Sequence, residues 1–249
     1  MGDFSVYKFY EWILSPFLNS SEHPMIFTEY PFWIFFLLVI IGYGLVYKKF
    51  RLRSTFLFLV SLYFYYKTSG FFFSILLFST IADFYLGKAI FISKKELYAK
   101  LFLGFSVAIN LLILIYFKYA YFFTDSFNAI IGSNWHPINH FASFTNQFSG
   151  SSFRVDQILL PVGISFYTFQ TMSYSIDIFR KKLSPVNNIF DFGFYVSFFP
   201  QLVAGPIVRA ADFIPQIHQP YSLTRQEFGM ALFWILNGLL KKFLLADYI

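Results

Sequence analysis

The feature that most constrains the fold is a long uncharged run at residues 31–47, PFWIFFLLVIIGYGLVY. With residues 26–30 ahead of it, the run reaches the roughly 20 residues that a helix needs to cross the hydrocarbon core of a bilayer. Lipid offers no water to backbone N–H and C=O groups, so helices are the expected spanning elements. Further apolar runs follow at residues 54–66, 70–87, 101–123, 158–179 and 226–246. The pattern predicts an all-α polytopic bundle of about six transmembrane helices.

Composition excludes a soluble protein. Hydrophobic residues make up 57% of the chain and charged residues only 13%, whereas about a quarter of the residues in a soluble domain are charged. The net charge of +6 would indicate a nucleic-acid partner if the basic residues formed one patch. They instead occur in short clusters between the apolar runs, so we expect no nucleic-acid partner. The absence of cysteine excludes a disulfide framework, a thiolate metal site and a cysteine nucleophile.

Basic clusters predict the orientation of the spans. They flank the apolar runs at residues 48–53, 88–100 and 180–182, and the positive-inside rule assigns such clusters to the cytoplasm. The stretch 124–157 is rich in Ser, Asn, Gly, His and Pro and shows little helical periodicity, so we expect an external loop. Residues 1–24 are aromatic and lack the basic start of a signal peptide. They predict an interfacial helix ahead of a membrane domain of residues 25–249.

Residues 189–209 do not show the pattern of a regular transmembrane helix. Gly193, Pro200, Gly205 and Pro206 would repeatedly interrupt a helix and free backbone groups that lipid cannot satisfy. Such a segment must be buried in protein or line a cavity. Arg209 and Arg225 flank the polar stretch that follows, so we expect a re-entrant element that returns to the cytoplasm.

A polar stripe is expected on the helix that begins near residue 163. Tyr167, Gln170, Tyr174 and Asp177 are spaced by three, four and three residues, which places them on one face. That face should point away from lipid. Its residues either form hydrogen bonds between helices or form part of a functional site. Asp177 has a simpler explanation as well, because Arg180 three residues later is within reach of an ion pair.

Other polar residues give weaker signals. Asp83 and Asn110 lie within predicted spans, and Asn237 and Lys241 lie on the last predicted helix. We expect these side chains to face inward and to serve in helix packing. The four histidines all fall in predicted loops, at positions 23, 136, 140 and 218. Pro137 argues against a helical His136 and His140 pair, so no metal site is expected. No nucleophile elbow or glycine-rich phosphate loop occurs in the sequence.

Two long segments resemble the signature of the membrane-bound O-acyltransferase (MBOAT) family. They are LPVGISFYTFQTMSYSIDIFR at residues 160–180 and FYVSFFPQLVAGPIVRAADFIPQ at residues 194–216, and they occur in the family's order. Shorter stretches at residues 25–36, 53–66 and 237–249 are similar to its bacterial polysaccharide branch, of the kind that O-acetylates alginate or transfers D-alanine to teichoic acid. The resemblance covers the chain from about residue 25 onward.

The resemblance implies a multi-pass acyltransferase of the bacterial inner membrane with a tunnel through the bilayer. An acyl donor, acetyl-CoA or a carrier-bound acyl group, would enter from the cytoplasm, and an envelope or exported polysaccharide would accept the acyl group outside. A buried histidine would assist the attack of a sugar hydroxyl, and no bound cofactor or metal is implied. Implied partners are the bilayer, an acyl carrier protein and further envelope acetylation proteins.

The resemblance also implies candidate residues for tunnel lining or scaffold in the two motifs. These are Ser165, Tyr167, Gln170, Tyr174 and Asp177 in the first motif, and Pro200, Gln201, Gly205, Pro206 and Arg209 in the second. Gly205 and Pro206 would set a backbone break. Arg209 could hold a phosphate or carboxylate of the donor, or serve only as an interfacial anchor.

None of the four histidines falls at a position that matches the family's catalytic histidine. The family's histidine-bearing segments lie downstream of a stretch like residues 241–249, so we expect this chain to be an N-terminal part, C-terminally incomplete and inactive alone. Two alternatives stay open from the residues: a non-catalytic scaffold or half of a split enzyme, and a transporter. The absence of an inverted repeat disfavours the transporter.

Overall fold

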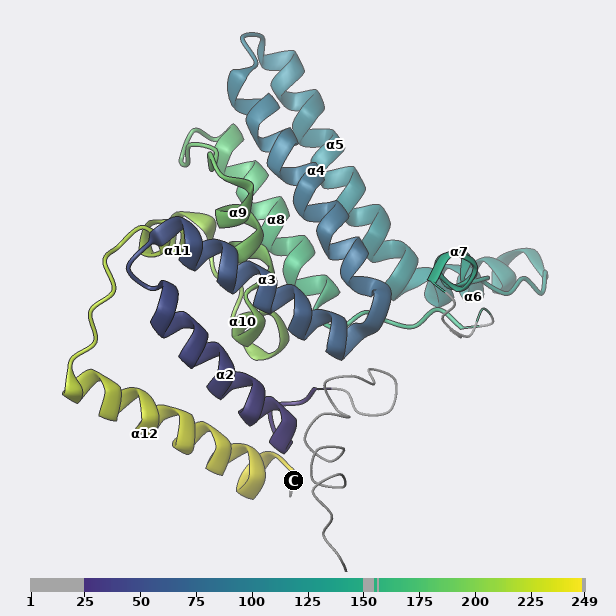
Figure 1. Ribbon diagram of the computed structural model, residues 1–249. Coiled ribbons are helices and arrows are strands. Elements are labelled where there is room, and N and C mark those ends of the chain that lie inside the picture. Colours follow the sequence, from purple (N-terminus) through teal and green to yellow (C-terminus); the bar gives the residue numbers. More distant parts are fainter. Residues whose placement is uncertain (1–24, 150–154, 156, 248–249) are drawn as a thin grey trace, which may run out of the picture.

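The computed structural model describes residues 25–149, 155 and 157–247, and all regular structure within those ranges is helical (Figure 1). The all-α prediction is confirmed. The interfacial helix expected at residues 1–24 lies outside the described residues.

Six long helices correspond to the six predicted spans. They are α2 (Tyr30–Val46), α3 (Phe50–Ser69), α4 (Phe73–Ile92), α5 (Glu96–Leu114), α8 (Ile164–Phe179) and α12 (Arg225–Lys241). A short 3-10 turn, η1 (Gly70–Phe72), joins α3 to α4, and the two helices diverge from this turn (Figure 1). Three stretches are long and apolar enough to cross a membrane by themselves: Phe50–Ile92, Glu96–Ile131 and Arg225–Ala246. This is the architecture of a multi-pass membrane protein.

The centre of the bundle is formed by α4, α5 and α8, which pack against one another. Gly87 on α4 permits the close approach of α8, because a Cβ there would lie 2.7 Å from Cε1 of Tyr174. Buried polar residues also join the three helices. Ser106 on α5 donates to Asp83 on α4 at 2.5 Å, and Thr171 on α8 donates to Asn110 on α5 at 3.0 Å.

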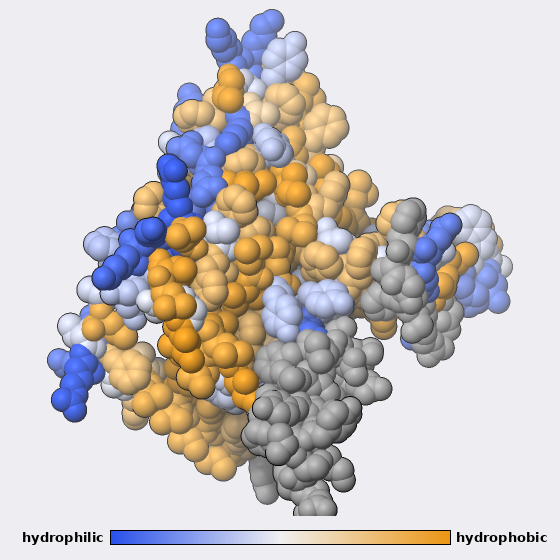
Figure 2. All heavy atoms as spheres, viewed as in Figure 1, coloured by the Kyte–Doolittle hydropathy of each residue, from blue (hydrophilic) through white to orange (hydrophobic). Residues whose placement is uncertain are grey.

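The outer surface is largely apolar, as expected where lipid replaces water. Phe166 and Phe169 on α8 are exposed although the opposite face of the same helix is buried. Figure 2 shows hydrophobic residues over most of this face, with hydrophilic residues at the top, along the left edge and at the far right around α6 (Ala120–Ile131) and α7 (His140–Ser149). The basic clusters lie at the top and left. That region carries the start of α3 and the α4–α5 turn (Figure 1), and we call it the basic end.

The prediction of little helical structure at residues 124–157 is wrong for much of their length. A π-helical turn, η2 (Ile115–Tyr119), continues α5 into α6 (Ala120–Ile131), and α7 (His140–Ser149) follows. The polar residues that suggested a loop instead cap these helices: Gly132 ends α6 in the left-handed conformation, and Asn139 accepts from the N–H of Ala142 at 2.9 Å.

The segment at residues 189–209 is broken as expected, and together with the residues that follow it forms three short helices. These are α9 (Ile189–Ser197), α10 (Phe199–Ala204) and α11 (Ala210–Ile217). Pro200 lies in the first turn of α10, and the chain leaves α10 at Gly205 and Pro206. The expectation that Gly193 interrupts a helix is wrong, because it lies within α9. A Cβ there would lie 2.6 Å from the Phe58 ring, so the glycine allows α3 to pack closely against α9.

The last helix, α12, stands apart from the bundle core. Thr224 and Glu227 form a capping box at its start, in which each side chain receives the other residue's backbone N–H. None of its residues is buried in the described structure, so Asn237 and Lys241 do not face inward there as the sequence suggested.

Candidate functional site

The polar stripe of the first motif faces the inside of the bundle. Tyr167, Gln170 and Tyr174 are buried on α8, and Asp177 is half-buried near its end. Ser165 is half-buried at the start of α8 and accepts from Nζ of Lys118 at 3.3 Å. The predicted orientation of the stripe is therefore confirmed for its first three members.

Hydrogen bonds tie the first motif to the second. Nε2 of Gln170 donates to the carbonyl of Tyr195 on α9 at 2.8 Å, and the Tyr195 hydroxyl donates to the carbonyl of Val208 at 3.1 Å. The Tyr174 hydroxyl accepts from the N–H of Val186 at 3.1 Å. Because a buried carbonyl or N–H without a partner is costly, these bonds fix α8 relative to α9 and the connection between them.

The second motif also packs against the start of α8, at Gly163. Gly163 has a φ of +73°, and a Cβ there would lie 2.7 Å from the carbonyl oxygen of Leu202 on α10. Pro200, Gln201 and Gly205 are half-buried around this contact, while Pro206 and Arg209 are exposed. Arg209 is the N-cap residue of α11. The two motifs thus pack closely at residues 163 and 202.

Two candidate residues carry buried polar atoms without a hydrogen-bond partner in the described residues. They are the Tyr167 hydroxyl and Nε2 of Gln201, and Oγ of Ser69 is a third such atom. The ring of Tyr167 meets that of Tyr65 edge to face, with centroids 6.5 Å apart, and Tyr65 donates to the carbonyl of Val162 at 2.7 Å. Unpaired buried polar atoms are few in native proteins and often mark a place for water or a ligand.

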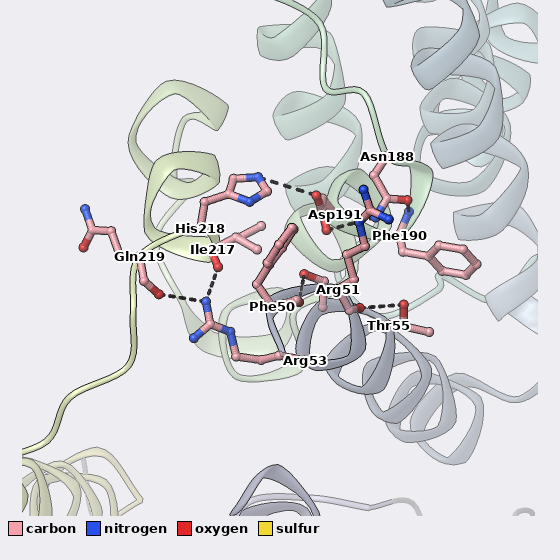
Figure 3. Close-up of polar contacts among 11 residues, drawn as sticks. Phe50, Arg51, Arg53, Thr55, Asn188, Phe190, Asp191, Ile217, His218 and Gln219 are labelled. Atoms are coloured by element: carbon pink, nitrogen blue, oxygen red, sulfur yellow. Dashed lines mark hydrogen bonds and ion pairs between the residues drawn. The ribbon is translucent and has the colours of Figure 1, made fainter. Parts of the chain in front are cut away.

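A second cluster lies at the basic end and was not predicted (Figure 3). In the sequence, Arg53 belongs to the basic cluster that follows the first span. In the structure its side chain is buried, with 6% of the residue exposed. Its Nη2 atom donates to the carbonyls of Ile217 and Gln219, the latter at 2.9 Å. Arg53 therefore attaches the end of α11 to the start of α3, across more than 160 positions of sequence.

The two carbonyls that Arg53 holds flank His218, which points the other way, toward the start of α9 (Figure 3). Its Nε2 lies 3.5 Å from Oδ2 of Asp191, whose side chain is almost fully buried. The Phe50 ring meets the imidazole edge to face at 5.6 Å. His218 is exposed in the turn after α11, as the sequence suggested, and the long-range fold also brings Asp191 to it. Asp191 was not among the residues selected from the sequence.

A cavity of about 320 Å³ adjoins Arg53. Its apolar walls include Phe194, Phe198 and Phe213 of the second motif, and its polar lining includes Gln216 and Arg53. Tyr43 and Tyr221, whose rings meet edge to face at 5.2 Å, also line it. The arrangement suits an elongated apolar group with a polar or anionic end near the guanidinium.

Histidine and carboxylate side chains form no cluster of three that could hold a metal ion within the described residues. His140 is the first residue of α7 rather than part of a loop, and His136 lies in the segment before it.

The fold defines the class of protein: a multi-pass, all-α integral membrane protein with two sequence motifs packed together in its interior. Its relatives define the family more closely. The chain is 39% identical over 150 residues to a protein named "Probable alginate O-acetylase AlgI" from Azotobacter vinelandii, an alignment that covers 60% of this chain and 27% of the relative. The protein of the same name from Pseudomonas syringae pv. tomato is 31% identical over 227 residues, which cover 90% of this chain and 40% of the relative.

A peptidoglycan O-acetyltransferase from Helicobacter pylori is 28% identical over 215 residues, or 37% of its own length. The chain is related to the MBOAT-like polysaccharide O-acetyltransferases, and the family resemblance of its motifs is confirmed. It spans roughly a quarter to two fifths of the length of these curated relatives. No family model and no solved structure matches it.

Proposed function

We propose that the chain is part of a membrane O-acyltransferase that acetylates hydroxyl groups of an envelope or exported polysaccharide. The observation that carries the proposal is its similarity, over up to 90% of the chain, to proteins named for alginate and peptidoglycan O-acetylation. The cavity beside Arg53 supports it, because residues of the second motif form the wall of a pocket at the predicted cytoplasmic end.

In the proposed reaction a polysaccharide hydroxyl oxygen attacks the carbonyl carbon of an acyl thioester. A carbon–oxygen ester bond forms, the carbon–sulfur bond breaks, the hydroxyl proton passes to a base and the thiol leaves. The donor is acetyl-CoA or an acyl group on a carrier protein, delivered from the cytoplasm, and a tunnel that excludes water favours transfer over hydrolysis. Further envelope acetylation proteins would receive or present the acceptor.

The ten motif residues are proposed to line or support the tunnel. The unpaired Tyr167 hydroxyl and the unpaired Nε2 of Gln201 support a lining role, since a polar substrate or water could satisfy them. Gln170 and Tyr174 already bond to backbone groups, which supports a scaffold role for them. Arg209 is exposed at the start of α11, where it could bind a donor phosphate or anchor the helix at the interface.

The test uses the complete natural protein that contains this chain, expressed in a strain from which the gene has been deleted. Ester-bound acetate is released from the purified polysaccharide with mild base and measured. Deletion should abolish the acetate and complementation should restore it. Ser222 is exposed and lines the cavity beside Arg53, so Ser222→Trp should block the cavity and lower acetate content about tenfold, or ~1.4 kcal/mol of barrier. Ser222→Ala is the matched control and should retain full acetylation.

Unchanged acetate after gene deletion would refute the proposed function. Unchanged acetate in Ser222→Trp alone would leave the family function in place and refute the cavity beside Arg53 as the donor entrance.

A further inference from the structure

A second cavity at the basic end is separate from the one beside Arg53. It has a volume of about 580 Å³ and lies between the α4–α5 turn and the end of α8. Apolar residues from three helices, including the buried Ile90, Ala99 and Ile178, form part of its wall. Its polar lining consists of Ser93, Lys94, Glu96, Lys181, Lys182 and Ser184.

The charge around this cavity is strongly positive. Glu96 is the one acidic residue in that polar lining, and it forms an ion pair of 2.8 Å with Lys100 and also interacts electrostatically with Lys181. Lys94, Lys181 and Lys182 form no ion pair with an acidic residue in the described part of the chain. Three lysines therefore line a cavity with an apolar wall, and a ligand with an anionic end and an apolar part would match it.

The backbone at Lys181 adds an independent observation. Helix α8 ends in a Schellman motif, in which the N–H of Lys181 bonds to the carbonyl of Ile178 and the N–H of Lys182 bonds to that of Asp177, both at 2.9 Å. Lys181 occupies the left-handed position of this motif with a φ of +59°, and it is the only non-glycine residue with a positive φ among the described residues. Glycine would adopt this conformation without strain. Strain of this kind often accompanies a functional side chain.

We infer that this cavity binds a phosphate group carried on a partly apolar molecule. Several lysines can share the oxygen atoms of one phosphate, and each ammonium can donate up to three hydrogen bonds. Two sources offer this chemistry at the predicted cytoplasmic surface: an anionic phospholipid of the inner leaflet and a soluble phosphate ester. The inference does not depend on the proposed acyltransferase function.

Binding is measured on the complete natural protein that contains this chain, purified in detergent micelles, with two probes. Retention of phosphatidylglycerol, relative to phosphatidylcholine, is followed by native mass spectrometry, and ADP binding is followed by the shift in melting temperature. Lys181→Gly removes one ammonium and relieves the backbone strain, so the variant should fold at least as well as the parent. Loss of one lysine should raise the apparent Kd about fivefold, the equivalent of ~1 kcal/mol. Lys182→Ala should have a similar effect.

The matched control is Lys95→Ala, because Lys95 is exposed on the same turn and does not line the cavity. It should leave both affinities unchanged. Selective binding of phosphatidylglycerol alone identifies a lipid site, and binding of ADP that depends on Lys181 identifies a site for soluble esters. The inference is overturned if neither probe binds, or if Lys95→Ala weakens binding as much as Lys181→Gly does.

Discussion

Asn110 on α5 donates from Nδ2 to Oδ2 of Asp83 on α4, with 2.7 Å between the two atoms, in the interior of the bundle. The same amide group accepts hydrogen bonds through Oδ1 from Ser79 and Thr171, at 2.9 and 3.0 Å. Asn110 thus connects all three central helices. The role assigned to Asp83 and Asn110 from sequence, inward-facing packing, agrees with these contacts.

The first prediction concerns removal of the Asp83 carboxyl group. Asp83→Ala removes the carboxyl group that accepts hydrogen bonds from the amide of Asn110 and the hydroxyl of Ser106 in a buried site. The Ser106 carbonyl and the Ser175 hydroxyl remain as partners for these two donors, and the folded state should lose about 1 to 3 kcal/mol. The measurement is the melting temperature of the purified chain in detergent. Asp125→Ala is the control, because Asp125 is exposed on α6. An equal loss for the two variants would show that the network does not stabilise the bundle.

A second prediction separates backbone strain from crowding at two glycines. Gly132 and Gly163 have nearly the same φ, +70° and +73°, but a Cβ at Gly132 would meet open space and one at Gly163 would meet the Leu202 carbonyl. Gly132→Ala should cost about 1 kcal/mol from strain alone. Gly163→Ala should cost about 3 kcal/mol, because α10 must also move. Similar melting temperatures for the two variants would argue against the close packing of the two motifs.

The sequence predicts those parts of this fold that follow from local geometry. The spacing of Tyr167, Gln170 and Tyr174 places them on one face of any α-helix, and their burial follows once that face is turned from lipid. Likewise, Pro200 is tolerated only in the first turn of a helix and Pro206 disfavours helical backbone at Gly205, so the breaks near them are predictable from the residues alone.

Other features depend on contacts that no local pattern reveals. The sequence shows Arg53 only as one member of a basic cluster. The fold shows that it is buried and bonded to carbonyls more than 160 residues later in the sequence. His218 and Asp191 are brought together by the same arrangement. The helices α6 and α7 were missed because Asn and Gly residues that cap helix ends resemble loop composition.

The third prediction concerns orientation, for which the chain's lack of native cysteines offers a clean test. Ser143 on α7 and Ser184 after α8 are both exposed serines, at opposite predicted sides of the membrane. In intact cells an impermeant thiol reagent should label Ser143→Cys and should label Ser184→Cys only after the membrane is permeabilised. The opposite labelling pattern would invert the topology and move both basic-end cavities to the outside.

The last prediction concerns the hydrogen bond from Gln170 to the Tyr195 carbonyl, which joins the two motifs. In the complete protein, Gln170→Ala should lower acyl transfer to the polysaccharide about tenfold, or ~1.4 kcal/mol of barrier, because α9 can then shift relative to α8. The folded yield in detergent should change little, since several other contacts hold the helices together.

The matched control is Phe169→Ala, one residue earlier on the exposed face of α8, where truncation removes no contact between the motifs. Acetate content and folded yield are measured for both variants. A fall in acetate content for Gln170→Ala at normal yield supports a positioning role for the residue. If acetate content and folded yield fall together, Gln170 is interhelical glue, and the contact between the two motifs stabilises the fold without tuning the reaction.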